Sequence, residues 1–456
     1  MCGIAGFLNP RNNDKKTEKE IYQILKKMNE VQRHRGPDDE GIFLENGCAL
    51  GHVRLSILDL YRGHQPMCKK KEGNTYAIIL NGEIYNMKTL KEQLIKEGEM
   101  FSTTSDTEVV LTGYIRYGIS YIEELNGIFS IALWDGKRKK LYLIRDRVGV
   151  KPLFYTKRGD TLIFASEIKG LFAYPGVKPV INREGLCEIF GLGPAKSYGK
   201  GVFKDIYEVL PGHFLEYDRE GLKDRAYWEL KAKEHTDSEK DTIEHTRWLV
   251  KDAVEMQMLS DIPISTFLSG GVDSSLVTAI CAKKLQKEGK NLNTFSFDFV
   301  NNHKYFKSNA FQPSEDRPWV DKMVDHAKTD HRYLECDNEN MIENLYKAVD
   351  ARDLPCMADV ESSMLYFCSK VAEKNKVVTL TGECADEIFG GYPWFHKEEC
   401  FKAEIFPWSM DMQPRKMLLN DDIIQKVDLE SYARTAYQKT INETPKLYGE
   451  DQIEAR

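Results

Sequence analysis

The pattern of apolar residues changes partway along the 456-residue chain, and this change constrains the fold more than any other feature. In the first half, short apolar runs are broken by Gly, Asn and Asp, as in TYAIILNGEIYN and GIFSIALWDGKRKKLYLIRD, which is typical of strands joined by tight turns. In the second half, helical patterns alternate with apolar strands, which indicates a parallel sheet covered on both faces. The sequence therefore predicts a strand-rich α+β domain followed by an α/β domain.

A charged segment, LKAKEHTDSEKDT, separates the two patterns. A chain of this length is expected to form more than one domain. We predict a first domain at residues 1–210, a connecting segment at 211–240 and a second domain at 241–456.

Composition excludes several classes of protein. The net charge of −7 argues against a nucleic-acid or anionic-membrane partner held by bulk charge. No apolar run approaches the roughly 20 residues that span a bilayer, and the start of the chain lacks the pattern of a secretory signal. The ten cysteines occur singly, without C-x-x-C or zinc-site spacing. These features predict a cytoplasmic protein with reduced cysteines.

The chain opens with MCGIAGF, which places a thiol one residue from the start. If Met1 is removed, Cys2 carries both a thiol and a free α-amine, whose pKa of about 7.7–8.0 suits it to act as base for the thiol. The alternative is a buried cysteine in a first strand, since free Cys packs as a small hydrophobe. The seven residues alone leave both interpretations open.

Three further motifs in the first half suggest a ligand. Asn81 and Gly82 follow an apolar strand, where a side-chain amide and a backbone N–H can form an oxyanion hole. Asp106 could hold an α-ammonium group, and Arg54 suits an α-carboxylate. A molecule with an amide at one end and an amino-acid head at the other is glutamine. The simpler interpretations are an Asn-Gly turn, a capping box in SDTE and a surface ion pair.

Two motifs of the second half suggest a nucleotide site. ISTFLSGGVDSSLVTAI predicts a strand, a glycine turn and a helix, whose first N–H groups and neighbouring hydroxyls (Ser269, Ser274, Ser275) can bind an anion. A P-loop is excluded because G-x-x-x-x-G-K-[ST] is absent, while an ordinary strand–turn–helix joint would not need the Ser/Asp cluster. TGECADEIFGGY places three acids after a strand, where α/β sheets bind ligands.

The first half resembles the class II, N-terminal-nucleophile glutamine amidotransferase domain. The motifs that carry this resemblance are MCGIAGF, RHRGPD, GHVRLSILDL, LNGEIYN, SDTE, LNGIFSIALWD and RDRVGVKPLFY. The resemblance implies an α/β/β/α sandwich in which Cys2 is the nucleophile and its α-amine the base. It also implies an oxyanion hole at Asn81 and Gly82, and glutamine-binding residues at Arg54, Glu83 and Asp106.

SGGVDSS resembles the pyrophosphate loop of enzymes that split ATP between its α and β phosphates, and TGECADE resembles asparagine synthetases. The resemblance implies an adenine-nucleotide α-hydrolase-like domain. It makes Glu383 the general base for attacking ammonia, Asp386 a ligand of aspartate, and Asp273 and Asp386 ligands of Mg²⁺. The residues it implies for binding ATP and pyrophosphate are Leu268, Ser269, Gly270, Gly271, Asp273, Ser274, Ser275, Ser296, Thr381 and Gly382.

Both halves together resemble the glutamine-hydrolysing asparagine synthetase family. That family adenylates the β-carboxyl of aspartate with ATP and Mg²⁺, attacks the adenylate with ammonia from glutamine, releases AMP and pyrophosphate, and tends to form homodimers. Because the family normally continues beyond the length of this chain, we expect a C-terminally shortened synthetase domain. The alternative is a glutaminase, or a regulatory relative that binds glutamine and ATP, with an incomplete synthetase half. β-Lactam synthetases fit less well, because they usually lack the nucleophile that Cys2 provides.

Overall fold

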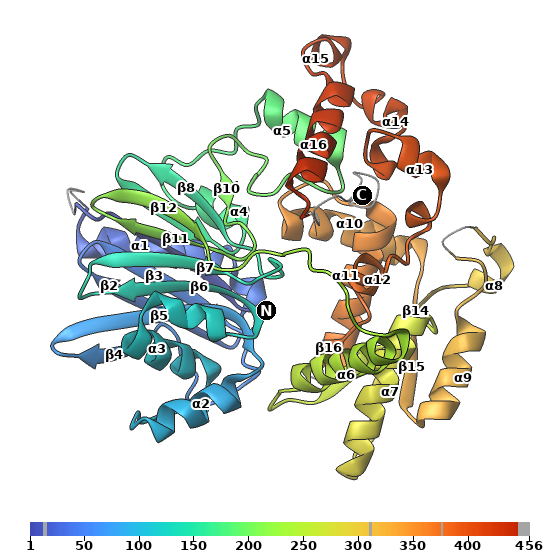
Figure 1. Ribbon diagram of the computed structural model, residues 1–456. Helices are drawn as coiled ribbons and strands as arrows, with labels where there is room; N and C mark the ends of the chain where they lie inside the picture. Colours follow the sequence, from blue (N-terminus) through green and yellow to red (C-terminus); the bar gives the residue numbers. More distant parts are fainter. Residues whose placement is uncertain (12–15, 310–311, 375–376, 446–456) are drawn as a thin grey trace. The chain divides into compact units, whose positions relative to one another are not determined.

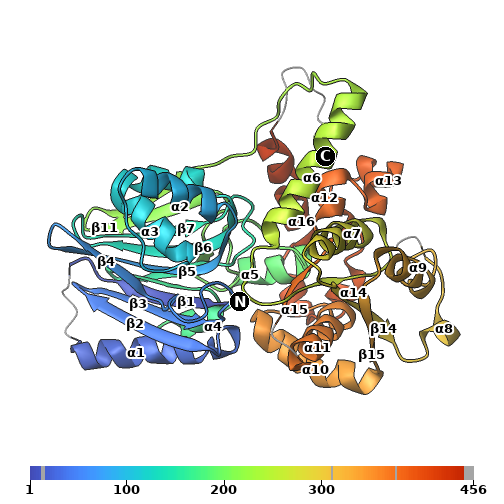
Figure 2. The same cartoon turned by 90° about the horizontal axis from the view of Figure 1, so that it is seen from below.

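The computed structural model describes residues 1–11, 16–309, 312–374 and 377–445 (Figures 1 and 2). It divides into two compact units. The first comprises Met1–Lys231 together with Asp411–Ala436, and the second comprises Ala232–Met410 together with residues 437–445. The domain boundaries at 210 and 240 stay a prediction, and the sequence pattern does not indicate that 411–436 joins the first unit.

The first unit contains two six-stranded antiparallel sheets (Figure 1). One has the strand order β10 (Tyr207–Glu208), β8 (Phe154–Arg158), β9 (Thr161–Ala165), β1 (Gly3–Leu8), β3 (Cys48–Arg54) and β2 (Asp39–Glu45). The other has the order β12 (Gly221–Ala226), β11 (His213–Asp218), β7 (Lys140–Arg145), β6 (Gly127–Asp135), β5 (Asn74–Ile84) and β4 (Met67–Lys71).

The two sheets pack face to face over an apolar core, and helices cover their outer faces. Residues of this core from both sheets include Ile4, Leu50, Phe164, Ile79, Trp134 and Leu143. Helices α1 (Glu18–Glu30) and α4 (Ile168–Phe172) pack on the sheet that contains β1. Helix α3 (Asp106–Tyr117) packs on β4 and β5, with α2 (Met87–Lys96) beside it. The predicted α/β/β/α sandwich is confirmed.

Local sequence explains several of these elements. Every residue of β1 is buried, because this strand lies between the core and α1, as its continuous apolar run predicts. Helix α1 begins with a capping box, in which the Thr17 hydroxyl accepts from the Glu20 N–H at 3.3 Å and Glu20 accepts from the Thr17 N–H at 2.7 Å. The tight turn that GIFSIALWDGKRKKLYLIRD predicts is the hairpin after Asp135, which joins β6 to β7.

The segment 411–436 contacts residues between α4 and β10. The Arg415 guanidinium donates to the Gly191 carbonyl at 3.2 Å, and the Tyr432 hydroxyl donates to buried Glu188. The remaining helical elements of this unit are η1 (Arg33–Arg35), η2 (Ile119–Glu124), α5 (Arg183–Cys187), the π-helix η3 (Glu188–Leu192), α14 (Gln413–Lys416), α15 (Asp421–Ile424) and the first part of α16 (Leu429–Glu443).

The second unit contains a four-stranded parallel sheet. Its strand order is β15 (Asp330–Cys336), β14 (Asn293–Phe299), β13 (Ile264–Phe267) and β16 (Val378–Leu380). Helices α6 (Glu239–Gln257), α7 (Val272–Lys287) and α9 (Arg317–Ala327) contribute to the core on one face. Helix α11 (Ala358–Lys374) packs on the other face, with α10 (Asn338–Arg352) beside it. The prediction of a parallel sheet covered on both faces is confirmed.

Short helices complete the second unit: α8 (Asn302–Tyr305), α12 (Ala385–Phe389), η4 (Pro393–Phe395), α13 (Glu398–Lys402) and η5 (Pro407–Ser409). Within the described ranges, no helix of either unit is both long and apolar enough to cross a bilayer.

Candidate active sites

Cys2 lies immediately before β1, where its thiol and backbone are both held. Its Sγ is 3.4 Å from the Leu55 nitrogen and 3.6 Å from the Leu55 carbonyl oxygen. The Arg35 guanidinium donates to the Cys2 carbonyl at 2.9 Å and pairs with Glu167 at 2.9 Å. Burial raises the pKa of the Cys2 thiol and lowers the pKa of the N-terminal amine, carried here by Met1, to about 6.

The ion pair behind Cys2 makes a contribution to stability that depends on pH. Burial alone would raise the pKa of Glu167, but hydrogen bonds from His34 and Arg35 outweigh it and hold the pKa at about 2. A carboxyl whose pKa is lowered by folding stabilises the fold above its unfolded pKa, and this contribution is lost as the pH falls through the folded value. Glu167→Gln is therefore expected to lower the free energy of unfolding by about 2 kcal/mol at pH 7.

Urea unfolding of the full chain from pH 7 to pH 3 tests this expectation. The difference between Glu167→Gln and the unaltered chain is expected to stay constant down to about pH 4.5 and then to shrink. A difference of the same size at pH 7 and pH 3 would show that the lost contribution is not that of an ionised carboxylate.

Arg54 is buried at the end of β3, with 6% of its surface exposed. Its Nη2 donates to the carbonyl oxygens of Leu58 and Asp59, each at 2.8 Å. Gly63 approaches so closely that a Cβ there would lie 2.1 Å from Nη2. These contacts fix the guanidinium in place, and they exclude the simpler interpretation of a surface ion pair.

Asn81 and Gly82 lie inside β5 rather than in a turn, opposite Ser130 and Phe129 of β6. Gly82 has φ +146°, and a Cβ there would lie 2.0 Å from the Ile128 carbonyl oxygen, so only glycine fits. The Asn81 side chain is buried, and its Nδ2 makes only a long contact of 3.5 Å with the Ser130 hydroxyl. Its Oδ1 is buried without a hydrogen-bond partner in the structure, so this amide retains unused hydrogen-bonding capacity.

Asp106 is not the cap of α3. Ser105 caps the helix by accepting from the Thr107 N–H at 3.2 Å, and Glu108 accepts from backbone N–H groups that precede the helix, so SDTE does not form a capping box. The buried Asp106 carboxylate instead accepts from the Ile84 N–H of β5 at 3.0 Å. Burial raises the pKa of this carboxyl.

The structure brings four predicted residues of the first unit together. The charges of Glu83 and Arg54 both act on the Cys2 thiol. Burial, followed by the charge of Asp106, raises the pKa of Glu83 well above its usual range. Arg35 and Lys151 also act on the N-terminal amine. The sequence analysis assigned no role to Arg35 or Lys151, although Arg35 lies in the motif RHRGPD and Lys151 in RDRVGVKPLFY.

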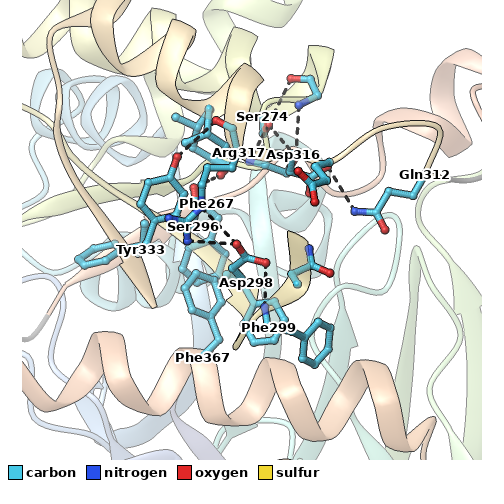
Figure 3. Close-up of a pocket in the computed structure, with 18 of the residues that line it drawn as sticks. Phe267, Ser274, Ser296, Asp298, Phe299, Gln312, Asp316, Arg317, Tyr333 and Phe367 are labelled. Carbon is cyan, nitrogen blue, oxygen red and sulfur yellow. Dashed lines mark hydrogen bonds and ion pairs between the residues drawn. The ribbon is translucent and has the colours of Figure 1, made fainter. Parts of the chain in front are cut away.

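A cavity of about 950 Å³ lies in the second unit, at the carboxyl ends of its parallel strands (Figure 3). Sequence-predicted residues that line it are Leu268, Ser269, Gly271, Asp273, Ser274, Ser296, Thr381, Gly382, Glu383 and Asp386. Gly270 and Ser275 do not line it. Gly270 has φ +82°, and a Cβ there would lie 2.7 Å from the Trp319 Cβ, so this glycine shapes the turn behind the cavity wall.

The loop before α7 closes on itself through hydroxyl groups. The Ser269 N–H donates to the Ser274 hydroxyl at 3.2 Å, and the two hydroxyls lie 3.0 Å apart. Gly271 is the N-cap residue of the 16-residue helix α7 and offers no side chain to its first N–H groups. The start of this helix is therefore suited to an anion.

The acids after β16 lie beside this loop. A Cβ at Gly382 would lie 2.8 Å from the Ser274 nitrogen, so the two loops meet at backbone distance. Burial, followed by the charge of Asp386, raises the pKa of Asp273. Cys384 also lines the cavity and has a left-handed backbone with φ +71°.

A further charged cluster in the cavity was not predicted. Arg317 pairs with Asp298 at 3.1 Å and with Glu335 at 3.0 Å, and its guanidinium lies 4.1 Å from the centre of the Tyr333 ring (Figure 3). Glu335 and Tyr333 belong to β15, whose sequence DHRYLEC lacks an apolar run. The sequence therefore did not predict strand β15, nor the part of the cavity that its side chains line.

These two units define a glutamine amidotransferase joined to a nucleotide-binding synthetase. Residues 1–228 match the family described as glutamine amidotransferase domain, and residues 245–455 match asparagine synthase. The chain belongs to the glutamine-hydrolysing asparagine synthetase family.

Two relatives illustrate the match. Asparagine synthetase [glutamine-hydrolyzing] 3 of Bacillus subtilis is 45% identical over 455 residues, which cover 100% of this chain and 73% of that protein. Putative asparagine synthetase [glutamine-hydrolyzing] 2 of Methanocaldococcus jannaschii is 34% identical over 417 residues, which cover 86% of this chain and 76% of that protein.

Proposed function

We propose that this chain makes asparagine from aspartate and ATP, with ammonia released from glutamine in the first unit. The observation that carries the proposal is the presence of both sites in one chain. The charges of Arg54 and Glu83 act on a thiol at the start of the chain, and the charge of Asp106 acts on Glu83. A cavity large enough for a nucleotide is lined by the loop before α7 and by the acids after β16.

In the first unit, the Cys2 thiol attacks the side-chain amide of glutamine after Met1 is removed. The α-amine of Cys2 accepts the thiol proton and returns it to the leaving ammonia. The Asn81 side chain and the Gly82 N–H, which are neighbours on β5, donate to the developing oxyanion. The Asn81 Nδ2 makes only the long contact of 3.5 Å with the Ser130 hydroxyl, and this leaves N–H donor capacity for the role.

The other end of glutamine needs two kinds of partner. The fixed guanidinium of Arg54 suits the α-carboxylate, and Glu83 and Asp106 suit the α-ammonium. Burial, followed by the charge of Asp106, raises the pKa of Glu83, and a bound cation would offset both effects. Water then hydrolyses the thioester and releases glutamate.

In the second unit, a β-carboxylate oxygen of aspartate attacks the α-phosphorus of ATP, and pyrophosphate leaves. The start of α7, with Ser269 and Ser274, binds the pyrophosphate. Ammonia then attacks the β-carbonyl carbon, Glu383 accepts a proton from it, and AMP leaves. Adenine lies near Ser296, at the carboxyl end of β14, and Asp386 contacts aspartate.

The residues at the cavity fit Mg²⁺. Asp273 and Asp386 are close enough for their charges to interact. In the described part of the chain, no group of three or more His, Cys, Asp or Glu side chains is arranged to hold a metal. Mg²⁺ commonly binds one or two carboxylates together with phosphate oxygens and water, which agrees with this pair. When bound, the ion neutralises charge on the pyrophosphate.

Gly382→Ala tests the contact between the two loops of the cavity. The added Cβ would lie 2.8 Å from the Ser274 nitrogen, so it displaces the backbone that is proposed to bind pyrophosphate. We expect asparagine formation to fall by about 100-fold, with a higher KM for ATP and unchanged glutamine hydrolysis. Steady-state kinetics of both reactions check this, and an unchanged KM for ATP would contradict it.

Glutamine labelled with ¹⁵N at its side-chain amide tests the proposed function as a whole. With aspartate and Mg-ATP present, we expect the label in the side-chain amide of asparagine. Labelled free ammonia without labelled asparagine would support the alternative of a glutaminase with an inactive synthetase half.

The homodimer and the cytoplasmic location stay predictions.

A further inference from the structure

Lys151 lies on a loop between β7 and β8 that is rigidly built around Asp146. The Asp146 carboxylate accepts from the N–H groups of Val148 at 3.2 Å, Val150 at 2.9 Å and Lys151 at 3.0 Å. The Arg145 guanidinium donates to the Lys151 carbonyl at 2.9 Å. The backbone of Lys151 is therefore fixed on both sides, and its side chain starts from a defined position.

The Lys151 side chain is buried, with 9% of the residue exposed, and extends to the N-terminus. Its Nζ lies 3.1 Å from the Met1 sulfur, which is a weak acceptor. Across the described residues, no carboxylate oxygen lies within 4.0 Å of this Nζ to form an ion pair. A buried ammonium is costly, so one that contacts a thioether and makes no close ion pair within the described residues calls for a reason other than stability.

Lys151 faces the groups that are proposed to break down glutamine. Its charge interacts with the Cys2 thiol and with the N-terminal amine. The other charged groups that act on Lys151 or on these two groups are Arg35, Asp38, Arg54, Glu83 and Asp146. Removal of Met1 takes away the sulfur and moves the α-amine to Cys2, about 3.8 Å along the chain.

We propose that Lys151 is a positioning residue for glutamine hydrolysis, whose ammonium keeps the α-amine of Cys2 unprotonated and stabilises the Cys2 thiolate. The proposal rests on the proposed function of the first unit. A neighbouring cation disfavours the protonated amine and favours the thiolate. It also makes the α-ammonium, once formed, a stronger acid toward the leaving ammonia. The buried setting strengthens these effects, because screening by water is weak there.

The pH dependence of glutamine hydrolysis tests the proposal. In Lys151→Met, a neighbouring positive charge is lost, so the pKa of the α-amine rises and the acid limb of kcat/KM moves to higher pH. We expect a shift of about one pH unit, and a loss of about tenfold in kcat/KM below the limb. Lys151→Arg keeps the charge and is expected to keep the limb.

The matched control is Lys157→Met, which removes an exposed lysine from the neighbouring strand β8 and is expected to leave the profile unchanged. Mass spectrometry verifies that Met1 is removed from every variant, and Lys151→Gln replaces Lys151→Met if the latter does not fold. A higher KM for glutamine with an unmoved acid limb would overturn the proposal, because Lys151 would then act only as a counter-ion of Glu83. An unchanged profile and rate would also overturn it.

Failure of the proposed function has a different signature. If the unaltered chain, with Met1 removed, releases no glutamate from glutamine, then the proposed glutaminase activity is wrong. A shifted limb in Lys151→Met is observable even if the second unit makes no asparagine, because the test measures glutamate alone.

Discussion

Replacing Cys2 by alanine is expected to abolish asparagine formation from glutamine and to leave asparagine formation from free ammonia unchanged. Alanine keeps the backbone that Arg35 holds at the Cys2 carbonyl, but it removes the sulfur that attacks the amide. Loss of a nucleophile leaves only the contribution of the oxyanion hole and of binding, so we expect glutamine hydrolysis to fall by at least about 10³-fold. Glutamate and asparagine are measured with each nitrogen source.

The control for this substitution is Cys68→Ala, which removes an exposed thiol from β4 of the same unit. Its activities with glutamine and with ammonia are expected to match those of the unaltered chain. Glutamine-dependent synthesis that persists in Cys2→Ala would contradict the assignment of the nucleophile, whereas equal loss with both nitrogen sources would indicate a folding defect.

Replacing Glu383 by glutamine is expected to impair asparagine formation while leaving glutamine hydrolysis intact. The neutral amide has nearly the same shape as the carboxylate but cannot accept a proton from ammonia as it attacks the adenylate. Loss of a general base typically costs about 10²–10⁴-fold, so asparagine formation should fall by this factor with either nitrogen source. Glutamine hydrolysis takes place in the first unit, and we expect it to continue. Parallel assays of glutamate and asparagine provide the test.

Glu399→Gln on α13 is the matched control, because this glutamate is exposed and does not line the cavity. We expect it to retain both activities. If Glu383→Gln retains asparagine formation, another group accepts the proton and the proposed role of Glu383 is wrong. If it also loses glutamine hydrolysis, the two activities are coupled or the chain is misfolded, and thermal unfolding separates these cases.

Much of the architecture could be predicted from local sequence. The short apolar runs of the first half predicted a strand-rich α+β domain, and β1 is such a run, buried between the core and α1. The α/β/β/α sandwich itself was implied by the family resemblance. Strand β15 was not predicted because DHRYLEC is mostly polar. Its strand conformation depends on pairing with β14 rather than on its own residues. The place of 411–436 in the first unit depends on contacts such as Arg415 to Gly191, which join residues 224 positions apart.

The candidate sites, like the fold, could be predicted only in part from local sequence. The motifs picked out Arg54 and Asp106, but only the structure reveals that Arg54 is fixed by backbone carbonyls and that Asp106 accepts from β5 instead of capping its own helix. Lys151 lies in a motif that was read as part of a family pattern. Its approach to Met1 joins residues 150 positions apart, and no local pattern predicts such a contact.

Simultaneous measurement of glutamate, pyrophosphate and asparagine tests the central claim most directly. The purified chain is given glutamine, aspartate and Mg-ATP, and the three products are followed in one reaction. The account predicts that pyrophosphate and asparagine form in equal amounts, with glutamate matching them. Glutamate formed without pyrophosphate or asparagine would contradict the account and leave the chain a glutaminase.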